Sequence, residues 1–213
     1  MRVMVTAGGT REYIDDIRVL TNISTGALGC TIAEEFLSNG HEVIYVHSKG
    51  AQMPSGRYLT CILADNITDA YEVMKEWTPK VNAVVHAMAV SDFTFNRTHP
   101  VKLKSTDLEG FIEHMRANVV KAPKILPNLK HWNPDAKIIG FKFEVGKTKE
   151  ELLEIAKHQL WSCDLDYTFA NDKKMIQDAN SHNGWLIDVD GNEIPCYNKP
   201  DIARKIVREL TGE

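Results

Sequence analysis

The chain has 213 residues, a formal net charge of −4 at pH 7 and 43% hydrophobic residues. This length suits a single domain, over residues 1–213, with a sizeable core. The acidic balance argues against a general nucleic-acid-binding protein, which carries a surplus of Lys and Arg. No stretch is apolar enough to span a membrane, and the first residues favour a strand over a signal peptide. We therefore expect a cytoplasmic protein with neither a nucleic acid nor a membrane as partner.

Short β-branched runs alternate with amphipathic segments along the chain. The runs predict strands at 2–6, 42–46, 58–62, 82–86, 137–141 and 166–170. The amphipathic segments predict helices at 24–39, 67–77, 123–131, 149–161 and 200–211. This alternation is typical of the α/β class, with a doubly wound, mostly parallel Rossmann-like sheet. Ligands of such sheets bind beyond the carboxyl ends of the strands.

Two segments depart from the alternation. Residues 183–197 contain Asp190-Gly191 between two alternating runs, which predicts a small added β-hairpin near the C-terminus. Residues 87–122 show few periodic signals, as a binding loop or lid does. Within them, 108–119 fits a helix as well as a strand.

The first strand leads into two glycine-containing stretches, at 6–12 and 22–29. We expect a helix to start at Ser24-Thr25, so that its free N–H groups and dipole form an anion site. The segment between the stretches supplies side-chain donors from Arg11, Arg18 and Asn22. The spacing differs from the G-x-G-x-x-G of dinucleotide-binding turns, which predicts a phosphate site of another design.

Other candidates follow later strands, and each has a plainer explanation. Asp92 lies just past the fourth strand and serves a ligand or only a turn. Lys102 and Lys104 share one face of an extended segment, which suits a triphosphate, although a solvated loop also explains them. Phe141 offers an aromatic face for a base or is simply part of the core.

Several familiar enzyme signatures are absent from the sequence. Tyr71 and Lys75 match Y-x-x-x-K, but they precede the fourth strand, too early for a short-chain reductase. The second strand is followed by 47–50, His-Ser-Lys-Gly, without the acid that a nicotinamide ribose needs. No H-E-x-x-H or G-x-S-x-G motif occurs. The four scattered cysteines are expected to be reduced thiols.

Taken in order, the motifs resemble those of one family. They are T-A-G-G-T-R-E at 6–12, Asn22 with S-T-G at 24–26, A-V-S-D at 89–92, Lys102-x-Lys104, P-K-I at 123–125, Gly140-Phe141 and A-N-D at 170–172. The chain resembles the phosphopantothenate–cysteine ligases (phosphopantothenoylcysteine synthetases) over nearly its whole length. Without the flavin-containing decarboxylase domain of many bacterial ligases, it looks like the stand-alone bacterial type.

The resemblance implies a specific reaction. Such ligases join 4′-phosphopantothenate to L-cysteine with CTP and Mg²⁺ through an acyl-cytidylate, and they release CMP and pyrophosphate. It also implies a homodimer, in which one subunit's hairpin or loop completes its neighbour's site, with 183–197 as a candidate for pairing. An NAD(P)-dependent reductase and a non-catalytic nucleotide-binding module remain as alternatives.

The resemblance also assigns residues. Catalytic roles fall to Asn22 and Lys102, and substrate contacts to Arg18, Asn22, Ser24, Thr25, Gly26 and Ala89. Nucleotide contacts fall to Gly8, Gly9, Asp92, Lys102, Lys104, Pro123, Lys124, Ile125 and Phe141. The chain departs from the family's K-x-K-K motif at Ser105, and basic residues of the 149–161 helix are represented by Lys157 and His158. The resemblance identifies no metal ligands.

Overall fold

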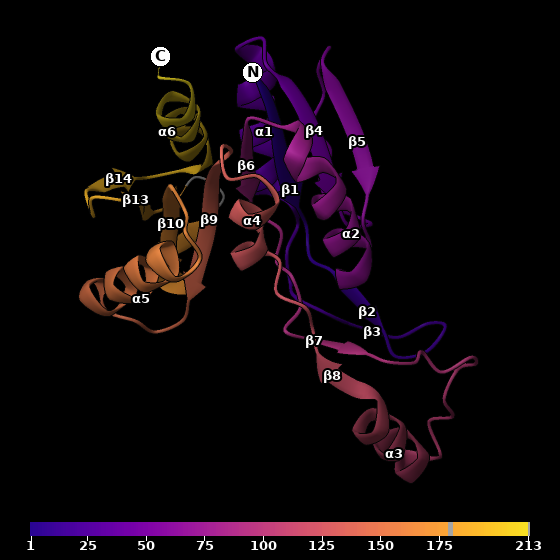
Figure 1. The fold of residues 1–213 in the computed structure, drawn as a ribbon. Coiled ribbons are helices and arrows are strands. Elements are labelled where there is room, and N and C mark those ends of the chain that lie inside the picture. The colour runs from indigo at the N-terminus through magenta and orange to yellow at the C-terminus, as the bar shows by residue number, and fades with distance from the viewer. Residues whose placement is uncertain (179–180, 213) are drawn as a thin grey trace.

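The computed structural model describes residues 1–178 and 181–212, and its centre is an eight-stranded sheet (Figure 1). The strands are β1 (Arg2–Ala7), β4 (Glu42–His47), β5 (Leu59–Leu63), β6 (Ala83–His86), β9 (Lys137–Glu144), β10 (Tyr167–Asp172), β13 (Gly184–Asp188) and β14 (Glu193–Cys196). Their order is β14-β13-β10-β9-β6-β1-β4-β5, and all neighbours pair in parallel except those of β13 and β14. The predicted sheet and C-terminal hairpin are thus confirmed. The chain order reverses between β1 and β6, where doubly wound proteins bind ligands.

Helices cover both faces of the sheet. One face carries α1 (Ala27–Ser38) and α6 (Lys199–Thr211), and the other carries α2 (Ile67–Trp77), α4 (Leu129–Trp132) and α5 (Lys149–Ser162). Val3 and Val5 of β1 pack against the first pair, while Met4 between them packs against the second group. Because strand side chains alternate in direction, a strand buried on both faces is apolar throughout.

Helix ends explain two differences from the expected boundaries. Gly26 precedes α1 with φ 72°, a left-handed conformation that cannot continue a helix, so α1 begins at Ala27 rather than at Ser24. The expected helix at 123–131 is also wrong. A 3₁₀ turn, η2 (Leu126–Asn128), contains Pro127 and leads into the single turn of α4.

Two further short 3₁₀ segments connect the elements, η1 (Thr78–Lys80) and η3 (Lys173–Met175). A two-stranded ladder, β11 (Ile176–Asp178) with β12 (Ser181–His182), lies before the C-terminal hairpin. Side-chain caps mark the remaining long helices: Asn66 caps α2, a Thr148–Glu151 capping box starts α5, and Asn198 caps α6.

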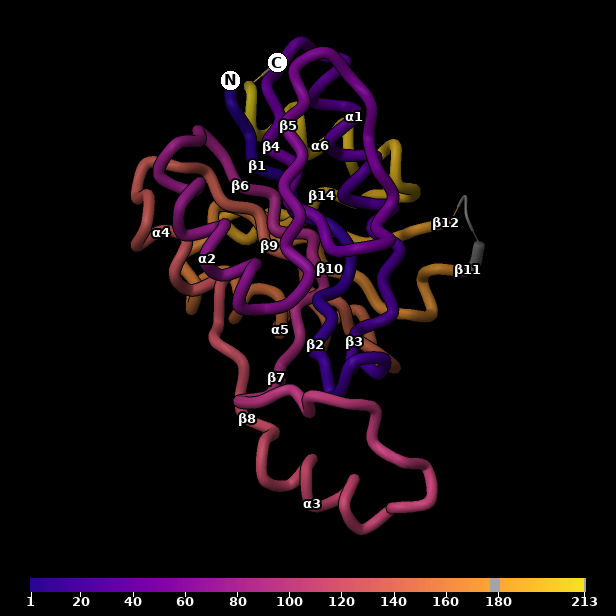
Figure 2. Tube along the Cα trace, turned by 90° about the vertical axis from the view of Figure 1, so that its right-hand side faces the viewer, coloured from indigo at the N-terminus to yellow at the C-terminus, as the bar shows by residue number. Residues whose placement is uncertain are grey.

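The stretch with few periodic signals forms an arm, defined here as residues 93–121. It consists of β7 (Phe93–Phe95), α3 (Leu108–Asn118) and β8 (Val119–Lys121), with β7 and β8 paired antiparallel. Figures 1 and 2 both show the arm extending from the carboxyl edge of the sheet, beyond the hairpin of β2 (Arg11–Tyr13) and β3 (Val19–Thr21). None of the residues of α3 is buried. The helix fits 108–119, and its exposure explains the weak periodic signal.

Candidate functional site

The T-A-G-G-T-R-E segment joins the ends of β1 and β6 by hydrogen bonds. The hydroxyl of Thr6 accepts from the backbone N–H of Met88 at 3.0 Å, and that of Thr10 accepts from the N–H of Ser91 at 2.9 Å. The N–H of Thr10 donates to the carbonyl of Ala89 at 3.2 Å. Both threonines are fully buried. The polar residues of this motif therefore hold two loops side by side at the switch point.

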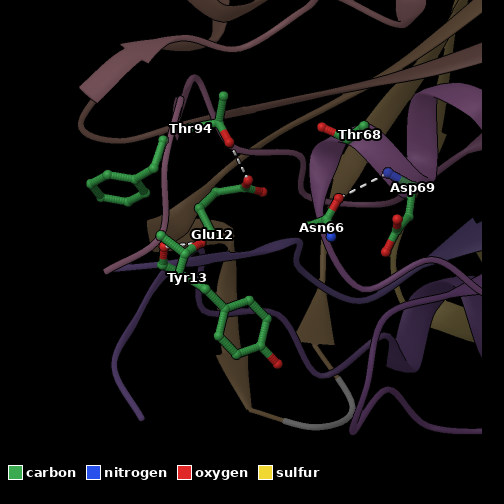
Figure 3. Close-up of a pocket in the computed structure, with 8 residues that line it drawn as sticks. Glu12, Tyr13, Asn66, Thr68, Asp69 and Thr94 are labelled. Carbon is green, nitrogen blue, oxygen red and sulfur yellow. Dashed lines mark hydrogen bonds between the residues drawn. The ribbon is translucent and has the colours of Figure 1, made fainter. Parts of the chain in front are cut away.

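Glu12, the last residue of the motif, connects three elements. Its side chain is buried; Oε1 accepts from the N–H of Ile67 at the start of α2 (3.0 Å), and Oε2 from the hydroxyl of Thr94 in the arm (2.6 Å). Figure 3 shows this carboxylate beside Asn66, the cap of α2. A cavity of about 200 Å³ lies here, lined by Glu12, Tyr13, Asn66, Thr68, Asp69, Thr94, Phe95 and Thr98. Glu12 thus fastens the arm to the sheet.

Packing alone requires glycine at two predicted nucleotide contacts. Gly8 has φ 89°, and a Cβ there would lie 2.1 Å from Ser48 Oγ. A Cβ at Gly9 would lie 2.5 Å from the carbonyl oxygen of Asn22. Neither glycine lines a described cavity, so their contact with a nucleotide stays a prediction.

Asn22 and Ala89, two predicted substrate contacts, lie together at the carboxyl end of β6. The Asn22 side-chain amide donates to the carbonyls of Val90 at 3.0 Å and Ala89 at 3.4 Å. The Asn22 residue itself is exposed. Its amide is therefore oriented by the backbone after β6 while remaining accessible to a ligand.

A polar cavity of about 270 Å³ opens at the N-terminus of α1, and we call it the α1 cavity. It is lined by Ile23, Ser24, Thr25, Gly26, Ala27, Leu28, Gly29, Ala87, Ile176, His182 and Lys199. The predicted substrate contacts Ser24, Thr25 and Gly26 are thus brought together. Because the first N–H groups of a helix lack partners, this cavity suits an anion.

His182 and Lys199 also border the α1 cavity, and sequence reasoning missed both. Asn171 Nδ2 lies 3.3 Å from His182 Nε2, so the amide donates and the ring proton lies on Nδ1. That Nδ1 is buried without a partner among the described residues. Burial, assisted by the charge of Lys199, lowers the pKa of His182 to about 4, which keeps the ring neutral. Lys199 forms no ion pair within 1–178 and 181–212, which leaves its charge available to an anion.

A second cavity, of about 370 Å³, lies on the other face of the sheet, and we call it the α5 cavity. It is mostly apolar and is lined by His86, Met88, Val90, Lys124, Ile125, Leu126, Pro127, Phe141, Gln159 and Cys163. Three predicted nucleotide contacts, Lys124, Ile125 and Phe141, are therefore together, whereas Pro123 is exposed beside them. Asp92 pairs with Lys124 at 2.5 Å across the rim.

Helix α5 presents uncharged residues to this cavity. Lys157 pairs instead with Glu193 of the C-terminal hairpin at 3.2 Å, and His158 is exposed. Gln159 and Cys163, one helical turn apart, are the α5 residues that line the cavity. A search for basic residues therefore gave no indication of them.

Arg18, Lys102 and Lys104 lie away from both cavities within one chain. The Arg18 guanidinium donates to the carbonyl of Leu103 at 2.8 Å and pairs with Asp15 at 3.2 Å. Leu103 is buried, and its N–H donates to Asp15 at 3.0 Å, while Lys102 and Lys104 on either side of it are exposed. The expected alternation is present, but on the arm, beyond the sheet edge (Figure 2).

Features of the other enzyme classes have structural explanations. The Tyr71 ring packs edge-on against Trp132 at 5.2 Å, between α2 and α4, rather than facing a ligand. In the part of the chain that the structure describes, no three His, Cys, Asp or Glu residues form a metal-holding group, and no helix is long and apolar enough to cross a membrane. All four cysteines are unpaired, as expected.

The architecture is that of a doubly wound α/β ligand-binding domain, with one polar and one apolar cavity where the sheet reverses its strand order. The family model of the DNA/pantothenate metabolism flavoprotein C-terminal domain matches residues 1–212. The chain belongs to this family.

Curated relatives agree with this assignment. A coenzyme A biosynthesis bifunctional protein, CoaBC, from Thermococcus kodakarensis is 32% identical over 212 residues, or 98% of this chain and 50% of that protein. The CoaBC of Methanocaldococcus jannaschii is 33% identical over 175 residues, or 80% of this chain and 40% of that protein. The chain therefore spans about half the length of these relatives or less.

Solved structures share the fold. The DNA/pantothenate metabolism flavoprotein from Streptococcus pneumoniae superposes with a TM-score of 0.88 at 30% identity, covering 100% of this chain and 99% of that one. The C-terminal domain of a CoaBC protein gives a TM-score of 0.78 at 25% identity, covering 98% and 93%.

Proposed function

We propose that the chain is a phosphopantothenate–cysteine ligase. The observation that carries this proposal is the pair of cavities at the end of β6, one polar and one apolar, with the Asn22 amide held between their shared loops. A reaction between a phosphorylated acid and a nucleotide needs two such subsites around one reacting centre. The similarity to CoaBC proteins over nearly the whole chain supports the same reaction.

The α1 cavity is proposed to hold the phosphate of 4′-phosphopantothenate. The first N–H groups of α1 donate to it, with the dipole of a 12-residue helix behind them. The Nδ1–H of His182 adds a neutral donor, and Lys199 adds the positive charge. The carboxyl end of the substrate then extends past Ala89 toward Asn22.

The α5 cavity is proposed to hold the base of CTP. Phe141 lines its apolar wall and suits contact with an aromatic base. The phosphates then lie at the rim near Lys124, whose ion pair with the exposed Asp92 opens when a stronger anion binds. CTP rather than ATP is proposed from resemblance to stand-alone bacterial ligases.

The chemistry requires activation of a carboxylate. The substrate carboxylate attacks the α-phosphate of CTP, which releases pyrophosphate and leaves an acyl-cytidylate; the amine of cysteine then displaces CMP. Asn22 polarises the acyl carbonyl through its amide N–H without adding charge. Mg²⁺ neutralises triphosphate charge when bound. It would be held mainly by the phosphates, with Asp92 as the exposed carboxylate at this edge.

The lysines for phosphoryl transfer are proposed to come from a second copy in a homodimer. Lys102 and Lys104 lie on an arm that extends away from its own cavities, and α3 has no buried residue in the isolated chain. An arm of this kind reaches a neighbouring site more readily than its own. Arg18, fixed to the same arm through Leu103, would enter with it.

A pyrophosphate-release assay with 4′-phosphopantothenate, cysteine and each nucleoside triphosphate tests this function. We expect release with CTP, a lower kcat/KM with ATP, and formation of the cysteine amide. Nucleotide binding without release would favour a binding module. Oxidation of NADPH with carbonyl substrates would favour a reductase.

A further inference from the structure

The α5 cavity contains one polar atom without a partner. The side-chain oxygen of Gln159, Oε1, is buried and accepts no hydrogen bond from the described residues. The backbone carbonyl of Gln159 is occupied by the N–H of Cys163 at 3.0 Å, so the free acceptor belongs to the side chain alone. An amide oxygen kept from water without a donor costs free energy. A bound ligand that brings a donor removes this cost.

The other polar groups of this cavity are already engaged. His86 lies 3.0 Å from the Thr6 hydroxyl through Nδ1, and burial lowers its pKa to about 4, so the ring is neutral. Lys124 is paired with Asp92 at the rim. A ligand in the apolar interior therefore meets one unpaired acceptor beside the aromatic ring of Phe141.

We propose that Gln159 is a specificity-determining residue that accepts a hydrogen bond from the exocyclic amino group of the nucleotide base. This inference rests on the proposed function, because it assumes that the α5 cavity holds the base. An amino-bearing base pairs with Oε1, whereas a base with a keto oxygen at that position places two acceptors against each other. Sites that hydrogen-bond a group strongly reject the analogue without it.

Cytidine and uridine nucleotides differ at this position by an amino against a keto group, so they are the probes. We expect wild-type protein to bind CMP more tightly than UMP in calorimetric titrations. Gln159→Met, which keeps the side-chain length but removes the acceptor, is expected to weaken CMP binding about tenfold, in keeping with the loss of one neutral hydrogen bond. UMP binding should change little, so the CMP/UMP ratio should collapse.

Two further variants separate recognition from damage to the helix. Gln159→Glu keeps an acceptor and is expected to retain a preference for CMP. Glu154→Gln alters an exposed residue of the same helix outside the cavity and should leave both affinities unchanged. Equal affinity of wild type for CMP and UMP, no binding of either, or an unchanged ratio in Gln159→Met overturns the proposal.

Turnover distinguishes this inference from the function on which it rests. Pyrophosphate release with CTP together with an unchanged CMP/UMP ratio in Gln159→Met leaves the ligase standing and removes Gln159. A collapsed ratio with no release under any condition supports selection of the base by Gln159 and removes the ligase.

Discussion

The two cavities share one strand end and differ in almost everything else. The α1 cavity has helix N–H groups, a neutral imidazole and an unpaired ammonium, whereas the α5 cavity has aliphatic and aromatic walls with one amide. Consecutive residues, His86 and Ala87, line opposite cavities because successive side chains point to opposite faces. One short segment therefore sorts an anionic and an aromatic group to the two sides of the sheet.

The largest expected effect comes from a residue that belongs to neither cavity. We expect Lys102→Gln to lower the rate of pyrophosphate release by about 10²–10³, because one preorganised charge is lost from the transition state. Folding should be unaffected, since Lys102 is exposed. Lys121→Gln, an exposed lysine of β8, is the matched control. Near wild-type release would exclude Lys102 from the first step.

Asn22 lies between the cavities, and Asn22→Asp should separate the two half-reactions. The change nearly preserves shape but replaces a donor with a negative charge. We expect one pyrophosphate per site, accumulation of acyl-cytidylate and amide formation slowed roughly 10²-fold. Mass analysis of a quenched single turnover measures each product. Normal amide formation, or no intermediate at all, would contradict this role.

Acid should destabilise both cavities through their histidines. His86 and His182 have their pKa values lowered by burial to about 4, while the unfolded chain binds their protons below about 6.5. The unfolded state therefore gains protons first, and stability falls as the pH drops from 6.5 toward 4. At pH 5 each histidine accounts for about 2 kcal/mol of lost stability.

Urea unfolding at several pH values measures this loss. His182→Asn should reduce its slope by about half over that pH range, whereas the exposed His158→Asn should not change it. An identical slope in His182→Asn would mean that this ring is not held neutral in the folded chain.

The smallest expected effect is confined to the α1 cavity. Lys199→Met should raise the KM for 4′-phosphopantothenate about tenfold, the scale of one partly exposed charge-assisted contact. CMP affinity should not change, because Lys199 lines only the polar cavity. A parallel loss of CMP binding would show that the cavities are not independent.

Much of this arrangement was predictable from the sequence. Alternating β-branched runs predicted the parallel sheet, and Asp190-Gly191 predicted the hairpin, because both signals are local. The helix start at Ala27 was missed, since the left-handed φ of Gly26 depends on tight packing against Ala51. His182, Lys199 and Gln159 were missed because they reach the cavities through tertiary contacts that no motif records.

The buried Glu12 and Asp15 carboxylates have a consequence for association. Glu12 accepts from Thr94 at the start of the arm, and Asp15 accepts from the N–H of Leu103 in its loop. An arm fixed at two points has little conformational freedom left to lose when another surface orders it, so the entropic cost of association is reduced before any contact forms. Loosening either carboxylate would then weaken assembly without altering a single residue at the interface.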